Sequence, residues 1–488
     1  MGRALLAVAL ALAALVLVAL LRASDFESKQ LAVKPTEVVA VDAAAVADRL
    51  AAAIRFRTVS HTDRRQIDEA EFKRFHRHLQ RTYPALHAAL EQERIAGQSL
   101  LYTWRGRRSD RRPVLLLAHQ DVVPVEKGTE KDWEQPPFAG RVAQGFVWGR
   151  GAMDDKGSLV CILEAVEALV AEGFRPERTV MLAFGHDEEL GGSLGAVVIA
   201  QKLHSRGVRP EFVLDEGGVI AVNMIPGMDA PVALIGIAEK GFATVDLRVD
   251  AEGGHSSMPL RNTAIGLVSR AVAEVESHPM PSGIGGATEL MIDYLGPELG
   301  FPTRVVLANL WLFRGVIARV LASEPTVNAM LRTTTAATLI QGGVKENVLP
   351  SHAWAAINFR ILPGDTIDGV VKHVRRSVTD ERVRVELSPR SPARNPSPIS
   401  PVDGEGFAVL QRTIGEVFPG VLVAPFLVLG GTDARHYKTI TDNLYRFGPF
   451  AFTSDARRRV HGTNERMGVE ALGDAVRFYI RLIRNTAG

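Results

Sequence analysis

The sequence has almost no cysteine, and Cys161 is the only one in 488 residues. A lone cysteine cannot form an internal disulfide, so a disulfide-stapled fold is excluded. Cys161 lies in a mostly apolar run from Ser158 to Leu163, where a small buried residue is far more common than a nucleophile. The chain must therefore fold around hydrophobic cores, and its length is enough for two or three domains.

The sequence also lacks an excess of charge of either sign. It has 57 Lys and Arg residues against 55 Asp and Glu residues, which gives a formal net charge of +2. Proteins that bind nucleic acid normally carry a clear basic excess, so no nucleic-acid partner is expected. With 46% hydrophobic and 23% charged residues, the composition is that of an ordinary globular protein and not of a disordered, collagen-like or repeat chain.

The N-terminus holds a long apolar run. Ala4 to Leu21 are 18 uninterrupted apolar residues, with Arg3 before them. A helix of that length can cross a bilayer. Cleavage of a signal peptide after Ala23 would need a small residue at Leu21, so we favour a transmembrane anchor over residues 1–22, and a signal is the alternative. The rest of the chain would then be membrane-anchored and exported, or else secreted or periplasmic.

Three short apolar runs farther along the chain each end in a cluster of polar residues. The runs lie at residues 113–118, 179–184 and 211–214. Each is typical of a strand that is buried on both faces, and helical patterns over 157–172 and 193–205 separate them. This alternation predicts an α/β domain with a mostly parallel central sheet that is covered by helices on both sides.

The pattern of polarity changes from about residue 236 to residue 375. Residues 243–249 and 353–359 predict strands, whereas 309–321 and 326–339 predict amphipathic helices. Strands grouped with helices predict a separate α+β domain inserted into the first one. The expected division is an anchor or signal at 1–22, a tether at 23–40, the main domain at 41–235 and 376–488, and the inserted domain at 236–375.

The polar clusters contain the residue types that bind zinc. Imidazole nitrogens and carboxylate oxygens are the usual ligands, and a two-metal site needs about five of them, one of which bridges both ions. It also needs a free carboxylate to take a proton from the metal-bound water. The clusters contain His119, Asp121, Asp154, Asp155, Lys156, Glu188, Glu189, Asp215, Glu216 and His461, and their two histidines and their carboxylates could supply this set.

Each cluster alone is weak evidence, because an acidic pair such as Glu188-Glu189 usually lies in a solvated loop. Three acidic clusters that each follow a buried strand are much less ordinary. The carboxyl ends of parallel strands are where open α/β sheets place their sites. Burying several like charges together is costly unless cations compensate, so the pattern favours a metal site.

The same residues resemble the motifs of a known family. Ala118 to Pro124 (AHQDVVP), Gly149 to Gly157 (GRGAMDDKG) and Asp187 to Ser193 (DEELGGS) are similar to three metal motifs of the aminoacylase, glutamate carboxypeptidase and succinyl-diaminopimelate desuccinylase family. Leu214 to Gly218 (LDEGG) and Glu239 to Gly241 (EKG) resemble its carboxypeptidase S branch, which includes secreted N-fatty-acyl-amino-acid hydrolases. The resemblance implies a di-zinc peptidase domain with an inserted lid domain, and it runs from about residue 41 to the C-terminus.

The resemblance implies a role for each metal-site residue. It assigns His119 and Asp215 to one zinc ion, Glu189 and His461 to the other, and Asp154 to a bridge between two Zn²⁺ ions. Glu188 would be the general base, and Asp121 would orient the His119 ring. Some branches of the family have a glutamate as the ligand in this segment, so Glu216 stays open as the alternative to Asp215.

The resemblance also implies three roles in the inserted domain. His255, in the segment Gly253 to Ser257, would stabilise the oxyanion of the tetrahedral intermediate. Asn347 and Arg360 would bind the carboxylate of the substrate, a task for which the planar arginine fork is suited. From the residues alone, a surface loop histidine, a turn asparagine and a surface ion pair would be the simpler interpretations.

The expected function is zinc-dependent hydrolysis of an amide bond next to a free carboxylate, in a small peptide or an N-acyl amino acid. The site residues do not separate a carboxypeptidase from an N-acyl-amino-acid amidohydrolase. A rival hypothesis is an inactive peptidase-like ectodomain that only binds a partner, although every expected ligand position is filled. A homodimer formed through the lid domain is a further expectation.

Overall fold

The computed structural model describes residues 1–259 and 261–488 and is built on a large, mostly parallel sheet. The strand order is β1-β2-β6-β3-β7-β17-β9-β8-β18, and β16 also pairs with β9. The strands are β1 (Glu91–Ile95), β2 (Ser99–Trp104), β3 (Val114–His119), β6 (Val180–Gly185), β7 (Phe212–Asp215), β8 (Val219–Ala221), β9 (Val232–Glu239), β16 (Leu422–Val428), β17 (Leu444–Arg446) and β18 (Ala451–Phe452). The expected α/β class and the three strands before the polar clusters are confirmed.

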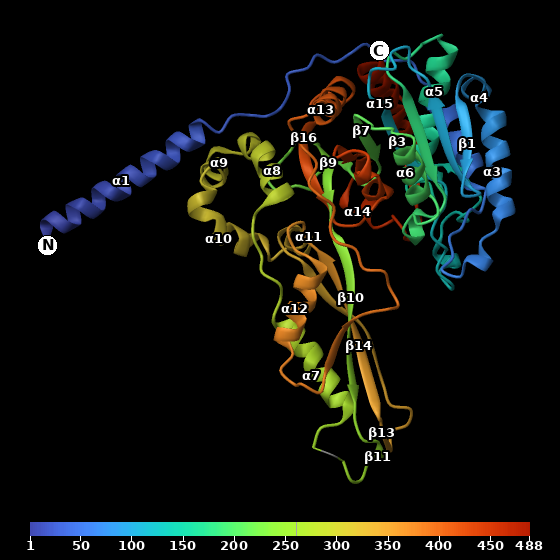
Figure 1. Cartoon of the computed structure of the whole chain (residues 1–488). Helices are drawn as coiled ribbons and strands as arrows, with labels where there is room; N and C mark the ends of the chain where they lie inside the picture. Colours follow the sequence, from blue (N-terminus) through green and yellow to red (C-terminus); the bar gives the residue numbers. More distant parts are fainter. Residues whose placement is uncertain (260) are drawn as a thin grey trace.

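Helices cover the large sheet on both faces (Figure 1). Successive residues of β3 point to opposite faces, and Leu116 packs in one hydrophobic core while Leu115 packs in another. This is why β3 is apolar without interruption. The helices of this body are α2 (Ala43–Ile54), α3 (Glu69–Thr82), α4 (Pro84–Ala89), α5 (Lys156–Ala171), α6 (Ala196–Ser205), α13 (Glu405–Val417), α14 (Ser454–Arg457) and α15 (Val469–Ala487). A small sheet of β4 (Arg141–Ala143), β5 (Phe146–Trp148) and β19 (Arg466–Gly468) lies beside it.

A separate four-stranded antiparallel sheet extends from this body (Figure 1). Its order is β12 (Thr334–Gly342), β14 (His352–Ile361), β10 (Gly241–Asp250) and β15 (Arg384–Leu387). Helices α7 (Ala264–Ser277) and α12 (Ile367–Ser377) pack on one face around a core of their own. A two-stranded sheet of β11 (Gly254–His255) and β13 (Val348–Leu349) forms the far tip. The strands of this unit thus run from residue 241 to 387, whereas the sequence pattern predicts an inserted segment of 236–375.

The helix predicted at residues 326–339 is only partly confirmed. Residues 326–339 were expected to be a single amphipathic helix, but α11 (Pro325–Leu331) ends early and β12 begins at Thr334. Three successive threonines, Thr333 to Thr335, separate the two elements. β-branched residues favour extended backbone, and pairing with β14 overrides the helical periodicity that follows.

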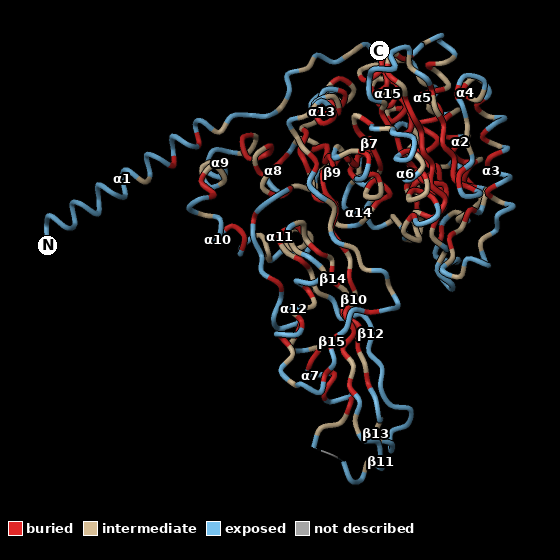
Figure 2. Tube along the Cα trace, viewed as in Figure 1, coloured by how far each residue is buried: buried red, intermediate tan, exposed pale blue. Residues whose placement is uncertain are grey.

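The N-terminal helix α1 (Gly2–Ser24) projects from the body and is exposed along most of its length (Figure 2). It is long and apolar enough to cross a membrane. Its C-terminal end packs beside α9 (Phe301–Leu307), which is followed by α10 (Leu310–Leu321), while α8 (Gly286–Leu295) packs on β16.

The tether is predicted at residues 23–40; in the structure residues 25–42, between α1 and α2, contain no helix or strand and are bound to the body. The side-chain amide of Gln30 donates to the carbonyls of Tyr294 and Val423, and its oxygen accepts from the Val423 N–H. The Gln411 side chain donates to the Lys29 carbonyl at 2.8 Å. We call residues 25–42 the strap. It joins α1 to the body through specific hydrogen bonds and is not a flexible linker.

Candidate metal centre

The predicted metal-site residues meet at the carboxyl ends of neighbouring strands. His119 is the last residue of β3, the short helical turn Glu188–Leu190 follows β6, and Asp215 ends β7. Since these strands run parallel, their carboxyl ends lie at one edge of the sheet. Asp154 comes from the loop before α5, and His461 from the loop before β19. Residues more than 300 positions apart thus form one side-chain cluster.

Two groups of side chains in this cluster could hold metal ions. The first contains His119, Asp154 and Glu216, and the second contains Asp154, Glu189 and His461. Within each group the potential ligand atoms lie within 4.8 Å of one another. Asp154 belongs to both groups, which is the position that a bridging carboxylate would occupy.

Asp154 lies between the two histidines. Its Oδ1 is 2.8 Å from Nε2 of His119, and its Oδ2 is 2.9 Å from Nε2 of His461. Nε2 of His461 is also 3.2 Å from Oε2 of Glu189. Each oxygen of one carboxylate thus faces a different histidine, so the two candidate ion positions are adjacent.

The structure places Glu216 rather than Asp215 in the first group. Oε1 of Glu216 is 3.7 Å from Nε2 of His119. Both oxygens of Asp215 already accept backbone hydrogen bonds, from the N–H of Glu216 at 3.0 Å and of Ala434 at 2.6 Å. The alternative that the sequence leaves open therefore has geometric support.

Asp121 connects the histidine strand to the glutamate turn. Nδ1 of His119 donates to the backbone carbonyl of Asp121 at 2.9 Å and lies 3.4 Å from its carboxylate. The same carboxylate accepts from Ser60 Oγ at 2.5 Å and from the N–H groups of Glu188 and Glu189 at 3.2 Å. Asp121 thus leaves Nε2 of His119 free to bind a metal ion. It also holds the backbone of Glu188 and Glu189 in position.

The cluster holds more negative charge than its histidines offset. Burial raises the pKa of Glu188 well above its usual range, and the Asp433 carboxylate raises it further. Burial also raises the pKa of Glu189 and of Glu216, and Asp154 adds to the shift at Glu216. Hydrogen bonds to Asp154 and Glu189 raise the pKa of His461 to about 10. This cluster favours bound cations.

A buried atom without a partner also fits a metal ion. Oε1 of Glu189 is buried and accepts no hydrogen bond from any of the described residues. Buried carboxylate oxygens are normally satisfied, so an unpaired one that faces a histidine-carboxylate group is a natural metal ligand. The donor set of nitrogen and oxygen atoms suits zinc.

Glu465 is a site residue that the sequence motifs did not reveal. It is fully buried and accepts from the N–H groups of Gly151, Met153 and Asp154, and from Nη1 of Arg150 at 2.6 Å. It thereby holds the loop that presents Asp154. Its only sequence signal is its position four residues after His461.

Two more residues border Glu188 without having been assigned a role from the sequence. Nη1 of Arg435 is 3.7 Å from Oε1 of Glu188. Asp433 is buried beside it, with Oδ1 unpaired among the described residues. Both belong to the start of the short helical turn Asp433–Thr439, which follows β16.

The three predicted residues of the inserted unit are not brought together. Arg360, on β14, lies at the base of the small sheet, where its guanidinium is 5.1 Å from the ring of Phe242. A cavity of about 370 Å³ opens there, lined in part by Arg360 and Arg390. His255 and Asn347 lie instead at the far tip, where the Asn347 carbonyl accepts from the Ser256 N–H. Neither tip residue reaches the metal centre of its own chain (Figure 1).

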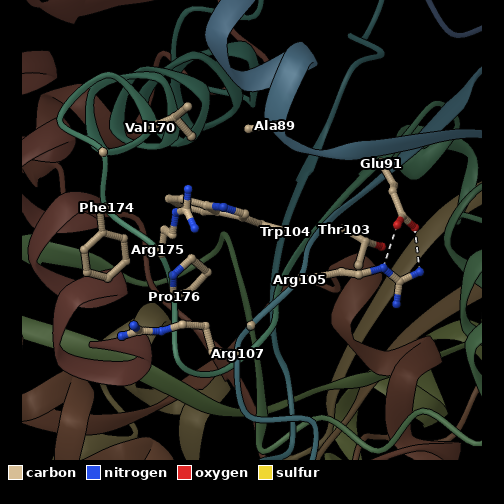
Figure 3. A pocket seen from close by; sticks show the side chains of 12 residues that line it. Ala89, Glu91, Thr103, Trp104, Arg105, Arg107, Val170, Phe174, Arg175 and Pro176 are labelled. Carbon is tan, nitrogen blue, oxygen red and sulfur yellow. Dashed lines mark hydrogen bonds and ion pairs between the residues drawn. The ribbon is translucent and has the colours of Figure 1, made fainter.

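A second cavity, of about 530 Å³, lies away from this chemistry (Figure 3). Trp104, Arg105 and Phe174 are among the residues that line it. Trp104 pairs with Val180 at the start of β6, whereas the metal centre lies beyond the end of β6. This cavity is therefore at the opposite end of the strands and takes no part in the site.

A family model described as Peptidase family M20/M25/M40 matches residues 115–485. The chain belongs to this family. The probable carboxypeptidase S-like 2 of Dictyostelium discoideum is 43% identical over 448 residues, which cover 90% of this chain and 85% of that one. The N-fatty-acyl-amino acid synthase/hydrolase PM20D1 of Xenopus tropicalis is 40% identical, covering 92% and 88%. Carboxypeptidase S of Saccharomyces cerevisiae is 30% identical, covering 90% and 83%.

Solved structures of the family share the fold of this M20 chain. The M20 family metallo-carboxypeptidase Sso-CP2 of Sulfolobus solfataricus superposes with a TM-score of 0.61 at 16% identity, covering 91% of this chain and 99% of that one. The dipeptidase Dug1p of Saccharomyces cerevisiae gives 0.61 at 15% identity, covering 91% and 96%. The family and its relatives establish a hydrolase that acts on amide bonds and depends on metal, as the sequence motifs predicted.

Proposed function

We propose that this enzyme is a two-zinc hydrolase that cleaves an amide bond next to a free carboxylate. The observation that carries the proposal is the pair of ligand groups that share Asp154, with the Glu188 carboxylate close enough to interact electrostatically with His119 and Glu189. The first group would hold one ion through His119 and Glu216 or Asp215. The second would hold the other ion through Glu189 and His461.

Glu188 is the residue that moves the proton. Two zinc ions, when bound, would lower the pKa of a water that they share. Glu188 is in neither ligand group, so its carboxylate is free to take the proton of that water. The oxygen of that water bonds to the amide carbon, and the C–N bond breaks as Glu188 passes the proton to the leaving nitrogen, which releases a carboxylic acid and an amine. Arg435, 3.7 Å away, keeps the Glu188 carboxylate oriented.

Paired variants separate the two candidates for the fourth ligand. We expect Glu216→Gln to lose one of two bound zinc ions, because Glu216 lies in the first ligand group. Asp215→Asn should retain both ions, because the Asp215 oxygens are engaged by backbone N–H groups. Zinc per chain, measured by plasma mass spectrometry on the folded proteins, distinguishes them. Loss of one ion in Asp215→Asn but not in Glu216→Gln would make Asp215 the ligand and contradict the placement of Glu216 in the first group.

Arg360 would select substrates with a free carboxylate. Its guanidinium faces a cavity at the base of the small sheet, next to Arg394, and both flank the ring of Phe242. A guanidinium binds a carboxylate strongly because it can donate two parallel hydrogen bonds to the two carboxylate oxygens. Arg394 is a second cationic group for the same carboxylate, one that sequence reasoning missed.

Arg360→Lys should lower kcat/KM by about 10- to 100-fold, mainly through KM, because one charge-assisted hydrogen bond contributes about 1.5–3 kcal/mol. Arg390→Lys is the matched control, since Arg390 lines the same cavity but pairs with Asp246 at 2.6 Å. The control should stay close to wild type. Equal losses in both variants would show that cavity charge alone matters and not the fork of Arg360.

The substrate is a small N-acyl amino acid or a peptide with a free C-terminus. Relatives named as N-fatty-acyl-amino acid synthase/hydrolase and as carboxypeptidase S are both similar over most of the chain. Assay of the zinc-loaded full chain on matched fatty-acyl amino acids, dipeptides and their C-terminal amides tests this. Cleavage of the free acids but not of the amides is expected, and equal cleavage of the amides would refute the carboxylate requirement.

A second copy of the chain would supply His255 and Asn347. Both lie at the far tip of the small sheet, on or beside the β11-β13 pair, so they would move together. Strand β12 is one of the two edge strands of that sheet, and Leu339 and Ile340 on it are more than half exposed. Exposed apolar edge strands pair readily, so β12 is suited to join its counterpart in a homodimer. In that dimer the small sheet would act as the lid, and His255 would stabilise the oxyanion in the partner's site.

Complementation tests this arrangement. Glu188→Gln and His255→Ala should each be nearly inactive alone. Mixed under conditions that exchange subunits, they should regain up to about a quarter of wild-type activity, because one of the two sites in a mixed dimer has both intact groups. Activity that stays at the level of the separate variants would place His255 in its own chain's site or outside catalysis.

We also propose that α1 anchors the enzyme in a membrane with its catalytic body exported. The helix is long and apolar enough, and it is mostly exposed outside a bilayer. A cleaved signal is the alternative, and the N-terminal sequence of the mature protein decides between them. The idea of an inactive binding ectodomain is not favoured, because all ligand positions are filled and the relatives are hydrolases.

A further inference from the structure

The outer face of α10 is apolar where a water-exposed helix would be polar. Leu312, Val316 and Val320 follow one another at single-turn spacing and are 41%, 61% and 65% exposed. The opposite face, with Leu310 and Ile317, is buried in the local core. A helix with apolar residues on two faces is stable when both faces are shielded from water. The protein core covers one face of α10 and leaves the other exposed.

Large apolar side chains are also exposed on the preceding segment. Phe301 and Val306 of α9 are 55% and 36% exposed, and Trp311, at the start of α10, is 54% exposed. Helices α9 and α10 contact each other, and large apolar side chains exposed together on two contacting helices favour a binding surface. We call Phe301, Val306, Trp311, Leu312, Val316 and Val320 the α9–α10 patch.

The α9–α10 patch lies beside the end of the membrane anchor. The Asn309 side chain donates to the Ala19 carbonyl of α1 at 3.0 Å, and the Arg22 guanidinium is 5.7 Å from the Trp311 ring. The apolar run of α1 ends at Leu21, and its 18 residues span about 27 Å, close to the thickness of a bilayer's hydrocarbon core. Ala19 is therefore within one turn of the hydrocarbon boundary, and so are the helices that touch it.

The body cannot swing away from that boundary. The strap after α1 is fixed to α8 and β16 through Gln30, and the Phe26 ring packs directly against Gly296 at the end of α8. A loose linker would let the body leave the surface, whereas this strap holds α9 and α10 next to the emerging helix.

The charges of this segment suit a lipid surface. Residues 299–323 contain Arg304, Arg314 and Arg319 and no Asp or Glu. Arg314 pairs with Glu289, but within the described part of the chain Arg304 and Arg319 have no acidic partner. Arginines that flank apolar side chains and a tryptophan are typical of helices that lie in the membrane interface.

We propose that the α9–α10 patch is embedded in the surface of the phospholipid bilayer that α1 spans. The patch buries its apolar side chains at the level of the acyl-chain boundary, and the exposed Arg319 faces anionic headgroups. This inference rests on the membrane anchor proposed above. The enzyme is thereby held against the membrane at two places, by a spanning helix and by an in-plane helix pair.

The test uses the full chain in nanodiscs of phosphatidylcholine and phosphatidylglycerol, with and without doxyl-labelled lipid. Because the native Cys161 is buried, an environment-sensitive thiol dye can be placed at single new cysteines. The test variant is Val316→Cys in the α9–α10 patch. Val142→Cys is the matched control, since Val142 is 45% exposed on β4. Leu12→Cys, within α1, reports insertion of the anchor.

The dye at 316 should emit at shorter wavelength than the dye at 142 and should lose most of its intensity with doxyl lipid, as the dye at 12 does. Long-wavelength, unquenched emission at 316 with a quenched dye at 12 would overturn the patch contact and leave the anchor standing. Short-wavelength but unquenched emission at 316 would show a protein covering the patch and would also overturn the proposal. An unquenched dye at 12 would overturn both.

Discussion

Glu188→Gln should lower kcat by about 10²- to 10⁴-fold while both metal ions stay bound. The glutamine keeps the size of the side chain but cannot accept a proton from water. Glu188 is in neither ligand group, so its replacement leaves the ion positions intact. Steady-state kinetics on the preferred substrate and metal content by plasma mass spectrometry check the two halves of this expectation.

Glu189→Gln is the matched control for that experiment. The two glutamates are adjacent, and both begin the same turn, but Glu189 lies 3.2 Å from His461 in a ligand group. The control should lose metal as well as activity. Full turnover in Glu188→Gln would refute the assignment of the base, and metal loss equal to that of Glu189→Gln would make Glu188 a ligand instead.

Glu465→Ala should destabilise the fold and empty the metal site together. Removing one partner of a buried ion pair costs about 3–5 kcal/mol, because the remaining charge is left uncompensated. Here Arg150 is the charge left behind, and three N–H groups of the Asp154 loop lose their acceptor. Thermal unfolding of the metal-free protein and zinc affinity of the folded protein measure the two effects.

Asp380→Ala provides the comparison for Glu465→Ala, since Asp380 pairs with Arg382 at the surface. Exposed ion pairs contribute little, so its melting temperature and zinc affinity should match those of the wild type. If Glu465→Ala melts at the wild-type temperature with normal zinc affinity, the loop is held by its other contacts and Glu465 has no positioning role.

The parts of the fold that local patterns encode were predicted well. Strands β3, β6 and β7 were visible as uninterrupted apolar runs, because a strand buried on both faces has no polar position. The polar residues that follow them met at one edge because parallel strands share a direction. His119, Asp154, Glu189 and His461 are close together in the structure as the family resemblance implied.

What was missed depends on contacts between distant segments. Glu465 looked like any loop acid, since its four donors come from more than 300 residues away. The sequence predicts a tether here but not its attachment to the body, because the partners of Gln30, Tyr294 and Val423, are far away in the sequence. The separation of His255 from the metal centre follows from the length of β10 and β14, which residue patterns alone do not place in space.

The junction between the two sheets makes the small sheet a lever. Glu239 ends β9, Gly241 begins β10, and the returning chain bonds to the same point through Arg394 and Ser397. Lys240 pins this pivot by donating to the carbonyls of Ala329 and Arg332 at 2.8 Å. Since ten residues of β10 span about 33 Å, a rotation of about 10° at the pivot would carry its far end by about 6 Å. In the proposed homodimer, a small rotation at the base of the sheet, where Arg360 would bind the substrate, would thus become the larger displacement by which His255 approaches or leaves the partner's site.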